Sequence, residues 1–227
     1  MLYDSPVPGR TFAIGDIHGC DVALETLLAK LALTAQDKVV VLGDVVDRGP
    51  NSRRVIETLI ELQSKCQLVL IMGNHEEMML SALEGDEWMQ SWPAYGGTTT
   101  LASYGDDPAN IPREHLDFLS SGRDFAETEL DIFIHASLDP RLELPAQPPE
   151  LLRWTHLSGN EAPHVSGKRV ICGHTPQLPG LPLSFPGWIC IDTAVFKQGW
   201  LTALDVDSGE IHQASQSGKF RKGTPTV

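Results

Sequence analysis

Short apolar runs in the first part of the chain end repeatedly in glycine followed by a polar residue. The runs TFAI, VVVL and LVLIM precede Gly15-Asp16, Gly43-Asp44 and Gly73-Asn74. Between them, residues 21–33 and 52–64 carry apolar residues at helical spacing. With Asp21 and Ser52 as the expected N-caps, this pattern predicts strand, helix, strand, helix, strand, helix. The alternation favours a largely parallel sheet with right-handed crossovers.

The pattern changes from about residue 84 to 123. This segment holds Trp88, Trp92 and Tyr95, a Gly-rich stretch and a short predicted helix at 112–122, and we interpret it as an inserted region that overhangs the site. Its aromatic residues either pack in the core and loops or form a surface that contacts the substrate. The strand-like runs DIFIHA, RVICGH, WICIDTA and residues 200–214 then predict a second, partly antiparallel sheet. We expect one domain over 1–216 and a flexible C-terminal tail over 217–227.

Composition excludes several classes of protein. The chain has 227 residues with 17 basic and 30 acidic side chains, a formal charge of −13, which disfavours a nucleic-acid partner. No run approaches the roughly 18 apolar residues of a membrane helix, and the N-terminus lacks signal-peptide features, so we expect a soluble, cytoplasmic protein without a membrane partner. Four widely spaced cysteines without a CxxC pair indicate reduced thiols.

Polar residues with metal-binding side chains follow most of the predicted strands. Because ligand sites in such sheets lie at the carboxyl ends of the strands, we expect these residues to converge. Carboxylate, amide and imidazole groups without thiolate suit manganese, iron or zinc. A carboxylate at Asp44 has two oxygens and can bridge two ions. The residues concerned are Asp16, His18, Asp44, Asp47, Asn74, His75, His135 and His174.

The segments GDIHG, GDVVDRG and GNHE together resemble the phosphoprotein phosphatase family of metallophosphoesterases. IHAS and CGHTP extend the resemblance from Gly15 to about Ala203. It implies an α/β fold of four layers, the α/β/β/α sandwich of calcineurin-like metallophosphoesterases. It also implies two divalent metal ions, with Mn²⁺ the leading candidate and Fe or Zn the alternatives.

The resemblance further implies a role for each residue. It assigns Asp16, His18 and Asp44 to one ion, Asp44, Asn74, His135 and His174 to the other, His75 as general acid, Asp47 as the residue that orients it, and Arg48 to the phosphate. These roles agree with elementary chemistry. Two cations would activate a bridging water as hydroxide for in-line attack, and an imidazolium would protonate the leaving oxygen. A carboxylate would keep that imidazole charged, and a guanidinium would bind phosphoryl oxygens.

The sequence departs from the family pattern at three places. Met72 stands where many members have arginine before GNHE, and His135 is followed by Ala136 and Ser137 instead of two glycines. The arginine that often lies two residues after a tryptophan is also missing, because Trp154 is followed by Thr155 and His156. Arg153 either replaces it as a substrate-binding residue or is an ordinary surface arginine.

Three functions fit these observations. The leading hypothesis is a metal-dependent phosphomonoesterase acting on phosphoserine, phosphothreonine or phosphotyrosine in proteins. The alternative is a hydrolase of dinucleoside tetraphosphates or other small phosphoesters, for which Trp88 or Trp92 could supply a stacking surface. Asp47 favours the first, since tetraphosphatases of the family often resemble GDxVARG. The third hypothesis is a metal-binding module without catalysis, used for partner recognition.

Overall fold

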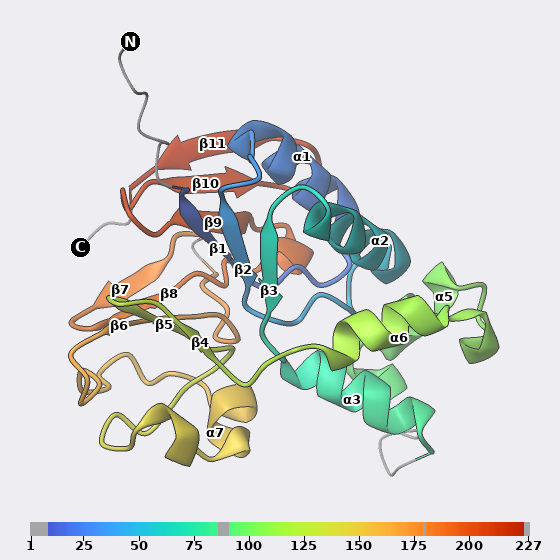
Figure 1. Cartoon of the computed structure of the whole chain (residues 1–227). Helices are drawn as coiled ribbons and strands as arrows, with labels where there is room; N and C mark the ends of the chain where they lie inside the picture. Colours follow the sequence, from blue (N-terminus) through green and yellow to red (C-terminus); the bar gives the residue numbers. More distant parts are fainter. Residues whose placement is uncertain (1–8, 86–90, 179, 225–227) are drawn as a thin grey trace.

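The computed structural model describes residues 9–85, 91–178 and 180–224, and its strands form two sheets (Figure 1). Within these residues, one sheet has the order β11-β10-β9-β1-β2-β3 and the other the order β4-β5-β6-β8-β7. The strands are β1 (Thr11–Ile14), β2 (Lys38–Val41), β3 (Gln67–Leu70), β4 (Ala126–Glu127), β5 (Asp131–Phe133), β6 (Arg169–Cys172), β7 (Leu183–Phe185), β8 (Trp188–Cys190), β9 (Leu201–Asp205), β10 (Ile211–Ala214) and β11 (Phe220–Gly223).

The predicted alternation of strands and helices in the first part of the chain is confirmed. β1, β2 and β3 are parallel neighbours, and a helix follows each of them. The α-helices are α1 (Asp21–Leu31), α2 (Ser52–Gln63), α3 (Asn74–Leu83), α5 (Gly97–Ser103), α6 (Arg113–Ser120) and α7 (Pro149–Trp154). Short 3-10 helices are η1 (Trp92–Tyr95), η2 (Pro108–Asn110), η3 (Leu144–Ala146) and η4 (Val195–Lys197).

The two predicted N-caps are wrong by one residue. Cys20 occupies the N-cap position of α1 without a side-chain capping bond, and Asn51 caps α2 by accepting a hydrogen bond from the backbone N–H of Arg54. Asp21 instead lies inside the first turn of α1, where its carboxylate accepts from the side chain of Asn51. Ser52 turns its hydroxyl toward the backbone of Asp47, so its side chain supports a loop and not the helix end.

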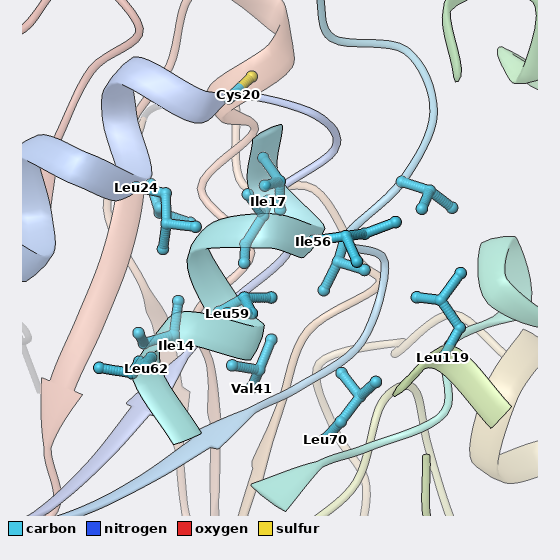
Figure 2. Packing of buried hydrophobic residues seen from close by; sticks show 14 of the residues in the cluster. Ile14, Ile17, Cys20, Leu24, Val41, Ile56, Leu59, Leu62, Leu70 and Leu119 are labelled. Carbon is cyan, nitrogen blue, oxygen red and sulfur yellow. The ribbon is translucent and has the colours of Figure 1, made fainter. Parts of the chain in front are cut away.

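Alternating side chains on the strands produce the four predicted layers. On β2, Val39 and Val41 pack toward α1 and α2, whereas Val40 packs against Phe133 and Ile171 of the other sheet. Figure 2 shows the first of these interfaces, with side chains of α2 set against the strands. The outer face of the second sheet is covered by α7 and neighbouring loops. The order is therefore helices, sheet, sheet, helix, and three apolar interfaces join the layers.

The prediction for the last strands is wrong in one respect. β9 and β10 do not extend the second sheet, because β9 pairs antiparallel with β1 and β10 pairs with β9. The short segment around η4, which resembles a hairpin turn in sequence, carries the chain from β8 in one sheet to β9 in the other. The first sheet thus becomes mixed, while the second keeps a parallel centre of β5, β6 and β8.

The predicted flexible tail at 217–227 is also wrong over part of its length. Residues Phe220–Gly223 form β11, which pairs antiparallel with β10. Phe220 packs against the first core, and its ring lies 6.2 Å from that of His212. Backbone pairing with β10 and the packing of Phe220 together place this strand at the edge of the sheet. Residues 225–227 lie outside the described part of the chain.

The segment between α3 and β4 contains η1, α5, η2 and α6. In Figure 1, α5 and α6 lie beyond β3. Both helices contact α2, and α6 also contacts α3. Phe118 and Leu119 of α6 join the first core. The four cysteines are free and buried, as expected. None of the described helices has the length and apolar character needed to cross a bilayer.

Candidate active site

Asp44 lies where two groups of potential metal ligands meet. His18, Asp44 and His75 form one group and Asp44, His135 and His174 the other, with the ligand atoms of each group within 4.8 Å of one another. The two oxygens of Asp44 face different histidines: Oδ2 is 3.5 Å from His18 Nε2, and Oδ1 is 3.4 Å from His135 Nε2. A carboxylate placed in this way can ligate one ion on each side.

The other two predicted ligands lie at the same place. Asp16 accepts a hydrogen bond of 3.1 Å from the backbone N–H of His174. The Asn74 side-chain oxygen is 3.1 Å from His135 Nε2. The structure therefore brings together Asp16, His18, Asp44, Asn74, His135 and His174, as the strand-end argument expects.

The loops that carry these residues have an unusual backbone. Left-handed φ angles occur at His18, Asp44, Asp47, Arg48 and His174. Such conformations are disfavoured for residues other than glycine and persist where the surrounding structure enforces them. Two neighbouring glycines allow close approach, since a Cβ at Gly173 would lie 2.1 Å from Asp16 Oδ1 and one at Gly73 would lie 2.4 Å from Asp44 Oδ1.

Backbone carbonyl groups fix the orientation of three imidazole rings. Nδ1 of His18 donates to the carbonyl of Val46 at 2.9 Å, and Nδ1 of His135 donates to that of Leu42 at 2.6 Å. His174 is reversed, with Nε2 donating to the carbonyl of Trp154 at 3.1 Å. Each ring thus presents its remaining nitrogen lone pair to the centre, as a metal ligand requires.

The ionisation of the site fits cation binding. Burial lowers the pKa of His18 and His135 and takes that of His174 to about 3. These rings are therefore neutral, and each keeps a nitrogen lone pair that can bind a cation. Burial alone would raise the pKa of Asp44, but its attraction to the protonated forms of the surrounding imidazoles, His135 foremost, holds that pKa well below its usual range. An anionic carboxylate among neutral imidazoles is the donor set that divalent transition metals bind.

Asp192 is a further buried carboxylate at this centre, and it was not among the residues predicted from the sequence. Burial, Asp192 and Asp44 together raise the pKa of Asp16 well above its usual value, and burial raises the pKa of Asp192 to about 6. One oxygen of Asp192 has no hydrogen-bond partner among the described residues. Bound cations would relieve this crowding of carboxylates. The signal was present in WICIDTA, where an aspartate follows an apolar run as at Asp16 and Asp44.

His75 differs from the histidines predicted to be ligands because its Nδ1 bonds a carboxylate. The distance from His75 Nδ1 to Asp47 Oδ2 is 2.7 Å. Its Nε2 is buried, has no hydrogen-bond partner within the described chain, and lies 4.0 Å from Asp44 Oδ2. Burial would lower the pKa of His75, but Asp44 and Asp47 outweigh it and the pKa is raised. A proton can therefore be held at a nitrogen that faces the centre.

Residues of α2 and the inserted region hold Asp47 in place, and sequence reasoning missed this role. Trp92 Nε1 donates to Asp47 Oδ2 at 2.9 Å, and the Thr100 hydroxyl donates to Oδ1 at 2.7 Å. The backbone N–H of Asp47 donates to Ser52 and Thr100. Trp92 is buried, so the packing interpretation of this residue holds, while Trp88 lies outside the described residues.

Glu76 organises the loop that contains Asp44. Its carboxylate is buried and accepts from the backbone N–H groups of Asp44 at 2.7 Å, Val45 at 2.8 Å and Gly73 at 3.1 Å. Few other acceptors could satisfy these donors in so closed a place. Glu76 therefore acts on the site by positioning the backbone on both sides of it.

Replacing Glu76 with glutamine is expected to lower the free energy of unfolding by about 3 kcal/mol, because an NH2 group would face buried donors that each cost roughly 1–3 kcal/mol when unsatisfied. Guanidinium denaturation of the chelator-treated protein measures this loss. Glu61→Gln is the matched control, since the Glu61 side chain is 56% exposed. Equal midpoints for the two variants would show that Glu76 does not hold the loop.

The two arginines predicted to bind phosphate have different surroundings. Arg48 lines a pocket at the centre, its Nη1 donates to His18 Nε2 at 2.8 Å, and its guanidinium lies over the ring of Phe196. Arg153 instead pairs with Glu77 at 2.6 Å and Asp124 at 2.5 Å. The structure therefore brings Arg48 to the centre but does not bring Arg153 into the pocket.

The pocket above the centre has a volume of about 230 Å³. Polar side chains of the strand-end loops and aromatic side chains of other segments both line it. The lining residues are Asp44, Arg48, Asn74, Tyr95, Trp154, His156, His174 and Pro176. A phosphate group bound here would contact the predicted metal ligands and Arg48 at the same time.

Comparison with known proteins gives relatives named as tetraphosphatases. The chain is 32% identical over 131 residues to a symmetrical bis(5'-nucleosyl)-tetraphosphatase of Nitrosomonas europaea, an alignment that covers 57% of this chain and 45% of the relative. It thus spans less than half of that protein. A protein of the same name from Pseudomonas entomophila is 25% identical, with 95% of this chain and 96% of the relative aligned.

A solved structure supports the fold. The crystal structure of a cold-active protein-tyrosine phosphatase from a psychrophilic Shewanella superimposes with a TM-score of 0.65 at 19% identity, covering 95% of this chain and 80% of that one. The family model described as calcineurin-like phosphoesterase matches residues 9–178, which include all the residues placed at the centre except Asp192. The chain therefore belongs to the calcineurin-like phosphoesterase family.

Proposed function

We propose that the protein hydrolyses dinucleoside tetraphosphates with the help of two divalent metal ions. The observation that carries the hydrolytic part is the placement of Asp44, whose two oxygens face two separate ligand groups. The substrate class is supported by the tetraphosphatase relative that aligns over nearly the whole chain. We thus favour the tetraphosphate hydrolase, which was the alternative from the sequence, over the protein phosphatase, which was the leading hypothesis.

The residues present fit a pair of cations, and Mn²⁺ is our proposed metal. Asp16, His18 and Asp44 would hold one ion, and Asp44, Asn74, His135 and His174 the other. Crowded buried carboxylates and neutral imidazoles with fixed lone pairs support this division. When bound, two cations supply activation of water and charge stabilisation for phosphoryl transfer.

The chain's own side chains supply positioning and a proton. Arg48 offers forked donors to phosphoryl oxygens from the wall of the pocket. His75 donates a proton from Nε2 to the leaving oxygen, and Asp47 keeps its ring oriented through Nδ1. Trp92 and Thr100 hold Asp47, so the acid is aligned before the substrate arrives.

A direct comparison of substrates tests this proposal. We expect the purified protein with added Mn²⁺ to hydrolyse diadenosine tetraphosphate with a kcat/KM at least about a hundredfold above that for phosphoserine or phosphotyrosine peptides, which is ~2.7 kcal/mol of transition-state stabilisation. Omission of metal after chelator treatment is the control. A preference for either peptide would overturn the substrate assignment.

A phosphoprotein phosphatase is the second candidate. The observation that favours it is Asp47, which stands where family tetraphosphatases often have alanine and which bonds His75 at 2.7 Å. A strong general acid matters most for a leaving alkoxide such as that of serine, because that oxygen departs poorly without a proton. The same comparison of substrates decides between the two.

A further inference from the structure

Three aromatic residues border the pocket above the metal-ligand side chains. Tyr95 comes from the end of η1, whereas Trp154 and His156 come from the end of α7 and the loop after it. Tyr95 is half-exposed, and His156 is exposed as well. Asp44 and Arg48 line the same pocket. If a phosphate binds in this pocket, the group esterified to that phosphate would therefore lie close to aromatic side chains.

The Tyr95 wall is tied to the loop that carries the acid pair. Trp92, at the start of η1, donates to Asp47, and the carbonyl of Gly96 accepts from the backbone N–H of Arg48 at 3.3 Å. Gly96 has a left-handed φ of 114°, and a Cβ there would lie 2.8 Å from Arg48. This close approach fixes Tyr95 relative to Arg48.

The wall at the end of α7 is tied to α3 and to a metal-ligand histidine. The carboxylate of Glu77 accepts from Arg153 at 2.6 Å and from Trp154 Nε1 at 2.7 Å. The carbonyl of Trp154 accepts from His174. The His156 ring stacks on that of His174 with centroids 4.5 Å apart and an interplanar angle of 26°. Arg153 thus helps to hold the aromatic wall and does not reach into the pocket itself.

We propose that Tyr95 and His156 form a stacking subsite for the nucleobase of the nucleotide whose phosphate lies at the metal centre. This inference rests on the proposed function. Every base offers a flat π-face, and stacking on aromatic side chains is a common way to bind it. Phosphoserine has no ring that could stack on these residues. Phosphotyrosine has one, so a phosphotyrosyl peptide is the competing ligand for this subsite. The sequence expectation that Trp92 provides stacking is wrong, because Trp92 is buried against Asp47. The same expectation for Trp88 falls outside the described residues.

The test compares a substrate that has bases with one that has none. In His156→Ala and Tyr95→Leu, kcat/KM for diadenosine tetraphosphate should fall about tenfold more than kcat/KM for inorganic tripolyphosphate, mainly through KM. His156→Phe and Tyr95→Phe keep a flat ring and should stay within about twofold of wild type on both substrates. Metal content is measured in every variant, and Leu178→Ala, an exposed substitution outside the pocket lining, is the control.

The outcomes separate the subsite from the proposed function. Wild-type protein that hydrolyses diadenosine tetraphosphate, with variants that lose equal activity on both substrates, would overturn the subsite and leave the function standing. Wild-type protein that ignores the tetraphosphate but cleaves a phosphotyrosyl peptide would overturn both. A loss confined to the base-containing substrate and restored by phenylalanine supports the subsite.

Discussion

Replacing Asp44 with asparagine is expected to reduce bound metal from two ions per chain to one or none and to lower turnover by about 10³-fold or more, since metal-assisted activation of water depends on the cluster. Asp44 presents Oδ2 to His18 and Oδ1 to His135. Asparagine keeps one oxygen, and its NH2 group has no lone pair to offer a cation. The variant therefore lacks the oxygen that would bind one of the two ions.

Elemental analysis after dialysis, together with kcat for diadenosine tetraphosphate, measures both effects. Asp131→Asn is a matched control, because Asp131 is also a buried carboxylate but pairs with Arg169 at the opposite end of β5 from His135. That control should keep both ions. If Asp44→Asn retained two tightly bound ions, Asp44 would not be the shared ligand, and the division of the site into two groups would have to be redrawn.

The strand-end residues could be predicted because they depend on local patterns alone. An apolar run identifies a strand, and consecutive parallel strands bring their carboxyl ends to one edge. Asp16, Asp44 and Asn74 follow β1, β2 and β3 in this way. Nothing more than the order of strands and helices was needed to place them together.

Contacts between distant segments could not be predicted in the same way. Trp92 reaches Asp47 across 45 residues, and Arg153 reaches Glu77 across 76. Periodicity gives the type of each element but not the partner that a polar side chain will find. Arg153 was a phosphate-binding candidate because it adjoins Trp154, but carboxylates from two other segments bind it. The position of β9 beside β1 is a pairing of the same long-range kind.

Replacing His75 with asparagine is expected to lower kcat by about 10² to 10⁴, the usual contribution of general acid catalysis, while both metal ions remain bound. The loss should be largest for an alkyl phosphate, whose leaving oxygen needs a proton, and smallest for p-nitrophenyl phosphate. This gradient separates proton donation from a structural effect. The His75 Nε2 atom lies 4.0 Å from Asp44, so metal content must be measured alongside turnover.

The pH dependence supplies a second readout of the same acid. His75 has a raised pKa in the folded protein, with Asp44 and Asp47 overcoming burial, so the acid is present below that pKa and activity is lost as pH rises through it. Asp47→Asn removes one of the two carboxylates and should shift the alkaline limb of kcat to lower pH. An unchanged limb in Asp47→Asn would show that Asp47 does not set the protonation of His75. Loss of metal in His75→Asn would make His75 a ligand of the group that contains His18 and Asp44 and not the proton donor.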